Sequence, residues 1–590
     1  MLPWTTYEDM YNAARLQPEQ FWLDAAQRIT WKRAPEIASR KREDGWYDWF
    51  SGATLNTCYN AVDRHVENGR GEQPALIWHS SAANACQIVT YRELQGRVAG
   101  FAGGLQSLGV EKGDRVLIAM PTMVETVIAM LACARIGAIH VVVFAGYAGP
   151  ELAHRIDDVT PKVIIFASYY FQNLTQISSL PVLNAALAQA AHKPDACIIV
   201  HRCKDSTPFS SSMTYDFHML EQSSPAAPLV LRAEDPLYIL HTSGTTGNPK
   251  GVVRDNGGHA VAMALSMELI YGCQPGDIFF TTSDLGWVVG HSYGVYAPLI
   301  SGCTSILIEG GASPSTIHGL CDKHKVQCLF TTPTQLRLIR QESRNLSHLH
   351  LASPAKVFVA GEYAEPTLLD WARSYFQRPV VNHWWQTETG WSITAHFFGL
   401  PEAEPAALMN DIGRPAPGFD MFIVPSIPGE ECGEIRLSLP LPPGCLAGVW
   451  KNETSHIPRS YLDVRGQHYR TFDEGMIDQT YALHMLGRSD DVIKVSGRRI
   501  SAVQIEKIIA AHPTVAVCAV ISVPDALRGH RPVAYVVPVN NVENTPSSQE
   551  IIAQVSHDLG KWTGLREVQF VNYLPMTVSG KIKRRDLSIC

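Results

Sequence analysis

The stretch that decides the fold reads Thr242-Ser243-Gly244-Thr245-Thr246-Gly247-Asn248-Pro249-Lys250-Gly251. It follows an apolar run, residues 237–240, that is typical of a buried strand. Glycines and small hydroxyl side chains let backbone N–H groups approach an anion, and a lysine adds positive charge. The spacing excludes a P-loop, because Lys250 lies six residues after Gly244 and is followed by glycine rather than serine or threonine. The stretch therefore predicts a phosphate-binding loop of another kind, with an exposed Gly/Ser/Thr loop as the plain alternative.

Upstream of this loop, strand-like and helical patterns alternate. Apolar runs at 115–120, 140–144 and 162–167 are separated by helical patterns at 123–136 and 151–158. The order strand, helix, strand, helix, strand is typical of a parallel sheet with helices on both faces. The sequence therefore predicts an α/β fold.

The chain is too long for one hydrophobic core. It has 590 residues, and single cores stop growing at roughly 250–300 residues. Short, turn-rich apolar segments at 411–439 predict a small β-subdomain, and a compact α+β pattern begins near Gly487. We therefore predict a large domain over residues 1–487, with an N-terminal cap region over 1–60, and a small domain over residues 488–590.

Composition narrows the classes of function and the compartment. The 49 basic and 56 acidic residues give a net charge of −7, which argues against nucleic acid or an acidic membrane surface as a partner. The most apolar stretch, 116–144, contains Glu125, Arg135 and His140 and is not a predicted membrane span. Thirteen scattered cysteines without a CxxC pair indicate reduced thiols, and residues 1–19 lack the pattern of a signal peptide. These features predict a cytoplasmic protein whose partners are small molecules, without stable membrane insertion, and they leave its oligomeric state open.

The phosphate-binding loop resembles that of the adenylate-forming superfamily, which includes acyl-CoA synthetases, luciferases and the adenylation domains of peptide synthetases. Four further segments match motifs of the superfamily in the same order: Trp384-Trp385-Gln386-Thr387-Glu388-Thr389-Gly390, Thr471-Phe472-Asp473, residues 487–497 and residues 575–581. The resemblance extends from about Tyr7 to Leu587. It implies a large N-terminal domain, in which helices sandwich parallel sheets beside a small β-subdomain, and a small mobile α+β C-terminal domain.

Within the superfamily the chain is most similar to the branch that activates acetate and propionate. The similarity rests on Tyr7-Glu8-Asp9-Met10-Tyr11, on Gly286-Trp287-Val288-Val289-Gly290-His291-Ser292-Tyr293 and on the pair Trp384-Trp385. Residues 253–259 resemble the corresponding segment of propionate-activating members more than that of acetate-activating members. The resemblance implies an acid–thiol ligase that uses ATP, Mg²⁺ and CoA. A carboxylate attacks the α-phosphate of ATP and pyrophosphate leaves; a thiol then attacks the acyl-adenylate and AMP leaves.

The resemblance also assigns roles to individual residues. Lys581 bridges the carboxylate and the α-phosphate, because its long side chain suits a point charge delivered by a mobile domain. Glu388 binds Mg²⁺ through ATP, and Asp473 accepts hydrogen bonds from the ribose hydroxyls. The alternative for each is an ordinary residue in a turn or on the surface. The predicted ATP and AMP contacts are Thr242, Ser243, Gly244, Thr245, Thr246, Gly247, Lys250, Gly361, Glu362, Tyr363, His383, Trp384, Gln386, Thr387, Asp473, Arg488 and Arg499.

The volume of the side chains that line the acyl pocket predicts the length of the acid. Trp385 closes its end in the resemblance, and Ala360 stands where acetate-activating relatives carry valine. The smaller side chain leaves room for one methylene, which is worth about 1–3 kcal/mol of discrimination. Propionate is therefore favoured over acetate, butyrate is tolerated and longer acids are excluded, unless Ala360 is only a packing residue. The other predicted pocket residues are Trp287, Val288 and Val289.

The thiol acceptor is the least determined substrate. The resemblance makes Asp490 the hinge and places Ser496 and Gly497 at CoA. Relatives carry an arginine at the CoA 3′-phosphate, where residues 171–176 of this chain contain no cation, and a second CoA-contacting arginine, where this chain has Ser556. Losing such contacts weakens phosphate binding. Either CoA binds weakly or the acceptor is another thiol, such as the phosphopantetheine of a carrier protein. The possible substitute cations are Arg528, Arg531, Lys561 and Arg566.

Three functions are compatible with these motifs. A short-chain acyl-CoA ligase is favoured, an enzyme that loads a carrier protein is the first alternative, and a non-catalytic nucleotide-binding regulator is the second. His291 is interpreted as a hydrogen-bonded core residue rather than a metal ligand, because no other ligand residues accompany it.

Overall fold

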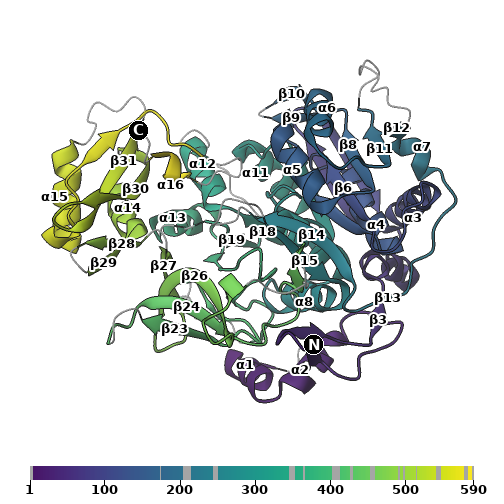
Figure 1. Ribbon diagram of the computed structural model, residues 1–590, viewed down its shortest axis with the longest axis horizontal. Helices are drawn as coiled ribbons and strands as arrows, with labels where there is room; N and C mark the ends of the chain where they lie inside the picture. Colours follow the sequence, from purple (N-terminus) through teal and green to yellow (C-terminus); the bar gives the residue numbers. More distant parts are fainter. Residues whose placement is uncertain are drawn as a thin grey trace.

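The structure of the chain is a computed structural model with one large and one small domain (Figure 1). It describes residues 4–172, 174–202, 214–242, 250–343, 353–362, 364, 366–401, 412–425, 429–451, 459–489, 492–495, 498–512, 514–539, 547–576 and 582–587.

The first large sheet contains the predicted parallel strands. Its strands are parallel from β12 to β14, and β15 and β25 add antiparallel pairs at one edge. The predicted helices at 123–136 and 151–158 are confirmed as α4 (Val124–Ile136) and α5 (Gly149–Val159). In spatial order the strands are β12 (Thr214–Asp216), β11 (Ala196–Val200), β8 (Val163–Ala167), β6 (Arg115–Ala119), β7 (Ile139–Val142), β14 (Pro236–Thr242), β15 (Lys250–Asp255) and β25 (Gly448–Val449).

A second large sheet packs against the same central core as the first. It is parallel except for the pair formed by its last two strands. In spatial order the strands are β20 (Val380–Asn382), β19 (Lys356–Val359), β18 (Cys328–Thr331), β16 (Ile278–Thr281), β17 (Thr304–Glu309), β4 (Pro74–Ser80) and β5 (Ala85–Thr90).

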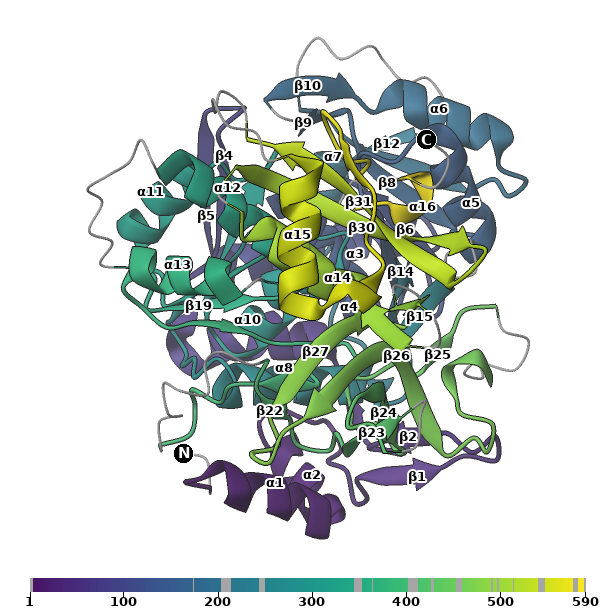
Figure 2. The same ribbon diagram turned by 90° about the vertical axis from the view of Figure 1, so that its left-hand side faces the viewer.

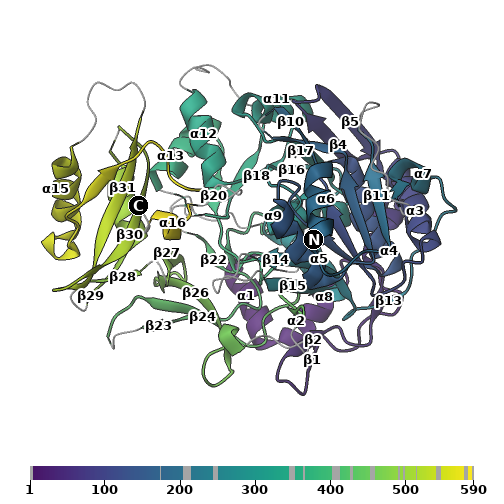
Figure 3. The same ribbon diagram turned by 45° about the horizontal axis from the view of Figure 1, so that its top comes forward.

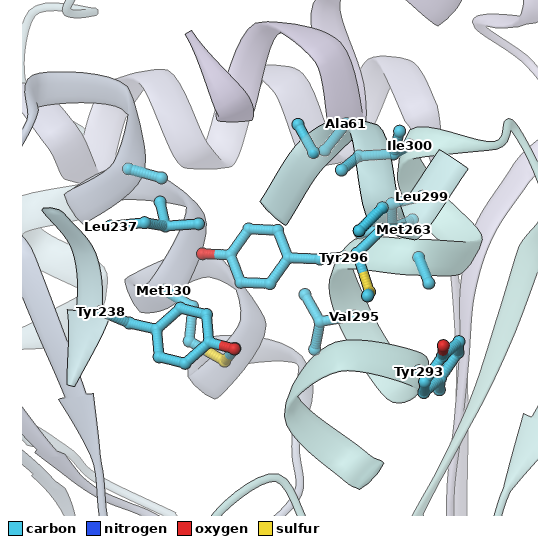
Figure 4. Close-up of a cluster of buried hydrophobic side chains, with 14 of the residues drawn as sticks. Ala61, Met130, Leu237, Tyr238, Met263, Tyr293, Val295, Tyr296, Leu299 and Ile300 are labelled. Carbon is cyan, nitrogen blue, oxygen red and sulfur yellow. The ribbon is translucent and has the colours of Figure 1, made fainter. Parts of the chain in front are cut away.

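Alternation along the strands assigns each sheet face to a separate core. In β6, Val116 and Ile118 pack into the central core, whereas Leu117 packs on the opposite face. The central core lies between the sheets and contains α3 (Tyr91–Ser107), α4, α8 (Asn256–Leu269) and α10 (Ala297–Ile300). Figure 4 shows part of it, where Met130 from α4 and Met263 from α8 approach Tyr238 and Tyr296. The outer faces are covered by α5 and α6 (Leu180–Gln189) on the first sheet and by α11 (Pro314–His324), α12 (Pro333–Ser343) and α13 (Pro366–Phe376) on the second.

The small β-subdomain extends further than predicted. It is a four-stranded antiparallel sheet of β23 (Met421–Pro425), β24 (Gly433–Ser438), β26 (His468–Ile477) and β27 (Leu483–Arg488). The prediction at 411–439 missed its second half, because pairing between β24 and β26 joins segments separated by about 30 residues of chain. Asp473 therefore lies within this subdomain.

The N-terminal helices pack against the same region. The hydroxyl of Tyr7 donates to the carbonyl of Pro415 at 3.0 Å, and that of Tyr11 donates to the carbonyl of Phe419 at 3.0 Å. Trp22 lies edge-on to Trp391, with ring centroids 6.4 Å apart. These contacts join α1 (Tyr7–Leu16) and α2 (Pro18–Ala26) to segments about 400 residues away. The remaining N-terminal strands are β1 (Ser39–Lys41), β2 (Tyr47–Trp49) and β3 (Thr54–Leu55), which pairs with β13 (Leu231–Arg232).

The C-terminal domain has its own cores. Its sheet runs β29-β28-β31-β30, with β32 beside β31, and α14 and α15 cover one face. Figures 1 and 3 show it at one side of the molecule next to α12 and α13, and Figure 2 views it from that side. The elements are β28 (Val492–Val495), β29 (Arg498–Ser501), α14 (Ala502–Ala510), β30 (Val515–Asp525), β31 (Gly529–Pro538), α15 (Ser548–Leu559), β32 (Val568–Phe570) and α16 (Arg584–Leu587).

The α/β prediction, with a second smaller domain, is confirmed. Among the helices in the described ranges, none is both long and apolar enough to cross a lipid bilayer.

Candidate active site

Only part of the predicted site falls within the described residues. Thr242 and Lys250 are opposite each other on β14 and β15, so the predicted phosphate-binding loop joins the ends of two neighbouring strands. For Arg499 only the backbone is described, in β29 opposite Lys494. The predicted residues outside the described ranges are Ser243, Gly244, Thr245, Thr246, Gly247, Tyr363, Asp490, Ser496, Gly497 and Lys581.

Residues 384–390 follow β20 and form a tight turn. The N–H groups of Thr389 and Gly390 both donate to the carbonyl of Gln386 at 3.1 Å. Gly390 has a φ of +75°, and a Cβ there would lie 2.3 Å from the carbonyl oxygen of Gly444. This close approach requires glycine. The turn therefore fixes the backbone that carries the side chains of Gln386 and Glu388.

Arg254 supports this turn from the interior of the large domain. Its Nη1 donates to the carbonyl of Glu388 at 3.0 Å, its Nη2 donates to the carbonyl of Thr387, and the residue is 1 % exposed. Because Arg254 belongs to β15, the strand that begins at Lys250 also holds the backbone at Glu388. The sequence indicated residues 253–259 only as a marker of the branch, so this supporting role was missed.

Asp473 lies at one end of a polar network. Its Oδ2 accepts from Gln386 Nε2 at 2.7 Å and from Trp384 Nε1 at 3.2 Å, and Arg488 Nη1 lies 3.6 Å from its Oδ1. The preceding Phe472 has a φ of +57°, an uncommon conformation for a non-glycine residue. The structure thus brings four predicted residues together, Trp384, Gln386, Asp473 and Arg488, and it orients the carboxylate of Asp473.

Glu388 lies at the other end of the same network. Its Oε1 accepts a hydrogen bond of 2.9 Å from the hydroxyl of Tyr461. The ammonium group of Lys250 lies over the ring of Tyr461, 4.6 Å from its centroid. Burial, and then the charge of Glu388, raise the pKa of Tyr461 well above its ordinary value, so its hydroxyl is a donor at neutral pH. No sequence motif pointed to Tyr461, because it lies outside every quoted segment.

A second tyrosine connects the two ends. Tyr469 stacks on Tyr461 with ring centroids 5.9 Å apart and an interplanar angle of 7°. Its hydroxyl donates to Gln386 Oε1 at 3.0 Å. Because Gln386 in turn donates to Asp473, one chain of contacts runs from Lys250 and Glu388 to Asp473.

Gly361 and Glu362, at the end of a strand, are among the predicted ATP and AMP contacts. Gly361 follows β19 and has a φ of +99°. The carboxylate of Glu362 accepts from the backbone N–H of Thr334 at 3.2 Å and from Arg337 Nη1 at 3.2 Å. These partners lie at the start of α12, so the side chain of Glu362 anchors the strand end to that helix.

The ring of His383 forms its hydrogen bonds inside the core. Burial lowers the pKa of His383 to about 4, so the ring is neutral at physiological pH. Its Nδ1 lies 2.9 Å from the carbonyl of Val359 and its Nε2 lies 3.0 Å from the hydroxyl of Tyr271. A neutral ring satisfies both partners when Nδ1–H donates and Nε2 accepts. The ring therefore fixes the chain just before Trp384 and leaves no ring nitrogen for a nucleotide.

A compact turn presents the predicted wall of the acyl pocket. Asp284 accepts from the N–H of Gly286 at 2.8 Å and from the hydroxyl of Thr122 at 3.0 Å. A Cβ at Gly290 would lie 2.1 Å from the carbonyl oxygen of Asp284. This packing places Trp287 at the start of α9 (Val288–His291), and Val288 and Val289 are half-buried against the central core.

The predicted end of the pocket is aromatic. Trp385 lies edge-on to Tyr293, with centroids 5.5 Å apart, and 6.4 Å from the ring of Phe330. Ala360 is 2 % exposed and donates its N–H to the carbonyl of Thr331, the residue after Phe330. Ala360 and Trp385 therefore pack around the same strand end of β18.

His291 is buried away from solvent. Burial lowers the pKa of His291 to about 3, and its Nε2 lies 3.1 Å from Nε2 of His140. Among the described residues, no group of three or more His, Cys, Asp and Glu side chains is arranged to hold a metal ion. This environment fits the interpretation of His291 as a core residue.

The segment predicted to lack a cation for CoA forms the hairpin β9 (Tyr169–Gln172) and β10 (Thr175–Ser178). Arg202 lies over the ring of Tyr169, 4.6 Å from its centroid. Both of its terminal nitrogens bind the carboxylate of Glu309, one at 2.7 Å, and its side chain is 7 % exposed. This arginine is therefore neutralised within the fold.

Comparison with known sequence families identifies the architecture. The profile of the AMP-binding enzyme family matches residues 62–441, and that of the AMP-binding enzyme C-terminal domain matches residues 504–581. The profile of the acetyl-coenzyme A synthetase N-terminus matches residues 7–61.

Individual relatives cover nearly the whole chain. The mitochondrial acyl-CoA synthetase short-chain family member 3 of Rattus norvegicus is 40% identical over 99% of this chain and 87% of its own length. The propionate–CoA ligase of Escherichia coli is 37% identical over 99% of this chain and 96% of its own length. The solved structure of an acetoacetyl-CoA synthetase from Streptomyces lividans shares the fold, with a TM-score of 0.85 and 21% identity over 98% of this chain and 88% of that one. The chain therefore belongs to the family of AMP-binding enzymes, in the group of short-chain acyl-CoA synthetases.

Proposed function

We propose that the protein is an ATP-dependent ligase that converts a short-chain carboxylate to acyl-AMP and then to acyl-CoA. In the first step a carboxylate oxygen attacks the α-phosphorus and the bond to pyrophosphate breaks. In the second step the sulfur of CoA attacks the acyl carbon, AMP leaves, and the thiol proton passes to solvent. The observation that carries the proposal is the network that places Asp473 and Glu388 at opposite ends of Gln386, Tyr469 and Tyr461.

The residues present fit Mg²⁺ and ATP. Glu388 offers carboxylate oxygens, the hard donors that Mg²⁺ prefers, and Lys250, which lies over the ring of the same Tyr461 that binds Glu388, would compensate phosphate charge. When bound, Mg²⁺ supplies positive charge that lets a carboxylate approach a triphosphate. Asp473, oriented by Trp384 and Gln386, would accept the ribose hydroxyls.

The roles of the residues outside the described ranges rest on the resemblance. In this proposal Lys581 stabilises the charge on the α-phosphate, and Asp490 is the hinge about which the C-terminal domain turns between the two steps. Ser496 and Gly497 then line the path of the thiol. Lys581→Ala should abolish acid-dependent pyrophosphate release while leaving AMP binding within about twofold, because a point charge at the reacting phosphate acts mainly in the transition state.

We propose propionate as the preferred acid. The support is the small volume of Ala360 beside Phe330 and the position of Trp385 at the same strand end. The decisive experiment measures pyrophosphate release with acids of two to six carbons, first without and then with CoA. We expect the highest kcat/KM with propionate, and release that continues only when CoA is present. The ligase proposal fails if no acid stimulates release, and the pocket proposal fails if hexanoate is best.

We further propose that cations of the C-terminal domain bind the phosphates of CoA. Val495, which precedes Ser496, pairs with Gly529, the neighbour of Arg528. Arg528 donates to the carbonyl of Trp562 at 3.4 Å, which places it beside the exposed Lys561. A double variant, Arg528→Ala with Lys561→Ala, should raise KM for CoA about tenfold or more and leave pyrophosphate release unchanged. An unchanged KM for CoA would refute this assignment.

We place the enzyme in the cytoplasm. The cysteines in the described ranges are free, and Cys273 and Cys328 have sulfur atoms only 3.5 Å apart without forming a disulfide. Paired thiols of this kind suit a reducing compartment. Cell fractionation tests the assignment, and recovery of the protein with an organelle or an extracellular fraction would contradict it.

A further inference from the structure

The geometry points to a function for Tyr461, which contacts both Lys250 and Glu388. We propose that Tyr461 is a positioning residue that holds Glu388 for Mg²⁺ and fixes the end of the phosphate-binding loop at Lys250. This inference rests on the proposed function, because it concerns the same nucleotide site. It assigns a defined task to a residue outside the sequence motifs.

Tyr461 is itself held from several sides. It is 6 % exposed and ends the short helical turn Arg459–Tyr461. The next residue, Leu462, forms an antiparallel bridge with Tyr469, whose ring stacks on that of Tyr461. A side chain fixed by its backbone and by a parallel ring can hold a partner in one geometry.

The two polar contacts of Tyr461 use different parts of the ring. The ammonium group of Lys250 lies over the π face, while the hydroxyl at the ring edge donates to Oε1 of Glu388. One neutral ring therefore contacts both charged side chains, and among the described residues Lys250 and Glu388 form no ion pair with each other. Both charges stay available for a ligand, because a neutral aromatic ring binds each without neutralising it.

The hydroxyl also decides how the carboxylate is presented. It occupies Oε1, and within the described ranges the structure shows no hydrogen bond to Oε2 of Glu388. A carboxylate has two oxygens with several lone pairs, so one donor leaves room for a metal ion. The hydroxyl therefore orients Glu388 rather than competing with Mg²⁺ for it.

Tyr469 supplies a matched control on the neighbouring ring. Its hydroxyl donates to Gln386, which in turn binds Asp473 at the predicted ribose end. The two tyrosines stack on each other, yet their hydroxyls reach opposite ends of the site. Tyr461→Phe and Tyr469→Phe each remove one oxygen atom, keep the stacked rings and keep the cation over the ring of residue 461.

The test measures binding as well as activity. Calorimetry gives the Kd of AMP without metal. Titration of Mg²⁺ at a fixed ATP concentration gives the Mg²⁺ concentration at which ATP binding is half-maximal, which is the Mg²⁺ requirement. For Tyr461→Phe we expect the Mg²⁺ concentration for half-maximal ATP binding to rise about tenfold, while the Kd of AMP stays within twofold. A hydrogen bond to a carboxylate changes an equilibrium constant by about this factor. For Tyr469→Phe we expect the reverse: weaker AMP binding and an unchanged Mg²⁺ requirement.

A double-mutant cycle isolates the contact. In the background of Glu388→Gln, the change Tyr461→Phe should have no further effect on the Mg²⁺ requirement, because the carboxylate that it positions is gone. An unchanged or lower Mg²⁺ requirement in Tyr461→Phe itself would overturn the inference. These binding measurements remain informative if the wild-type protein releases no pyrophosphate with any acid, an outcome that would refute the proposed function alone.

Discussion

Gln386 Nε2 donates a hydrogen bond of 2.7 Å to Oδ2 of Asp473, although 87 residues separate them in the chain. The same nitrogen lies 2.6 Å from the carbonyl of Thr471. One amide group thus holds both the strand and the carboxylate predicted to bind ribose.

Replacing this amide should weaken nucleotide binding without changing the KM for the carboxylic acid. Gln386→Leu removes the donor to Asp473 and leaves Trp384 as a donor to the same oxygen. We expect the Kd of AMP to rise about three- to tenfold, which corresponds to one lost hydrogen bond to a charged group. Calorimetry with AMP measures the change, and KM for propionate serves as the internal control. Equal AMP affinity in both proteins would show that Asp473 needs no support from Gln386.

Arg254 should matter for stability as well as for activity. Arg254→Met leaves the carbonyls of Thr387 and Glu388 without a donor in a buried place. Loss of buried hydrogen bonds to a charged group costs about 3–5 kcal/mol when the partners remain. Urea unfolding measures this loss. Arg40→Met is the control, because Arg40 is exposed and its nearest acidic contact is 3.8 Å long. Equal urea midpoints for Arg254→Met and Arg40→Met would contradict the supporting role of Arg254.

The preference for propionate should shift with one side chain. Ala360→Val fills the space next to Phe330, so the ratio of kcat/KM for propionate over acetate should fall about 10- to 100-fold. The matched control is Ala372→Val in α13, which adds the same two methyl groups to the core on the outer face of the second sheet. We expect the control to change stability but not the ratio. A ratio unchanged in Ala360→Val would remove Ala360 from the acyl pocket.

The buried His383 should make stability depend on pH. Its folded-state pKa is about 4, below the ordinary value of 6.5, so the unfolded chain binds a proton that the folded protein does not. The contribution of neutral His383 to the free energy of unfolding is fully present above pH 6.5. It is lost as the pH falls from about 6.5 toward 4, by about 1.4 kcal/mol per pH unit. His383→Gln retains a donor and an acceptor and should reduce this slope, measured by urea unfolding at several pH values. His557→Gln, on the surface, should not.

Local sequence patterns predicted much of the fold but little of the support around the site. The α/β alternation, the two domains and the residues Trp384, Gln386 and Asp473 follow from segments a few residues long. Arg254 and Tyr461 act through contacts across 134 and 73 residues of chain, which no local pattern encodes. For the same reason the sequence did not show that the ring of His383 is used inside the core.

The hydrogen bonds of Tyr7 and Tyr11 to Pro415 and Phe419 bear on the order in which the protein is assembled. The ribosome makes the carbonyls that accept from these tyrosines about 400 residues after it makes α1. Met10, on the same helix, is buried in the folded protein. The helix α1 therefore cannot make these contacts until residue 419 has been synthesised, and apolar segments left exposed in the meantime favour aggregation. Chaperone demand should accordingly be greatest before residue 419 leaves the ribosome.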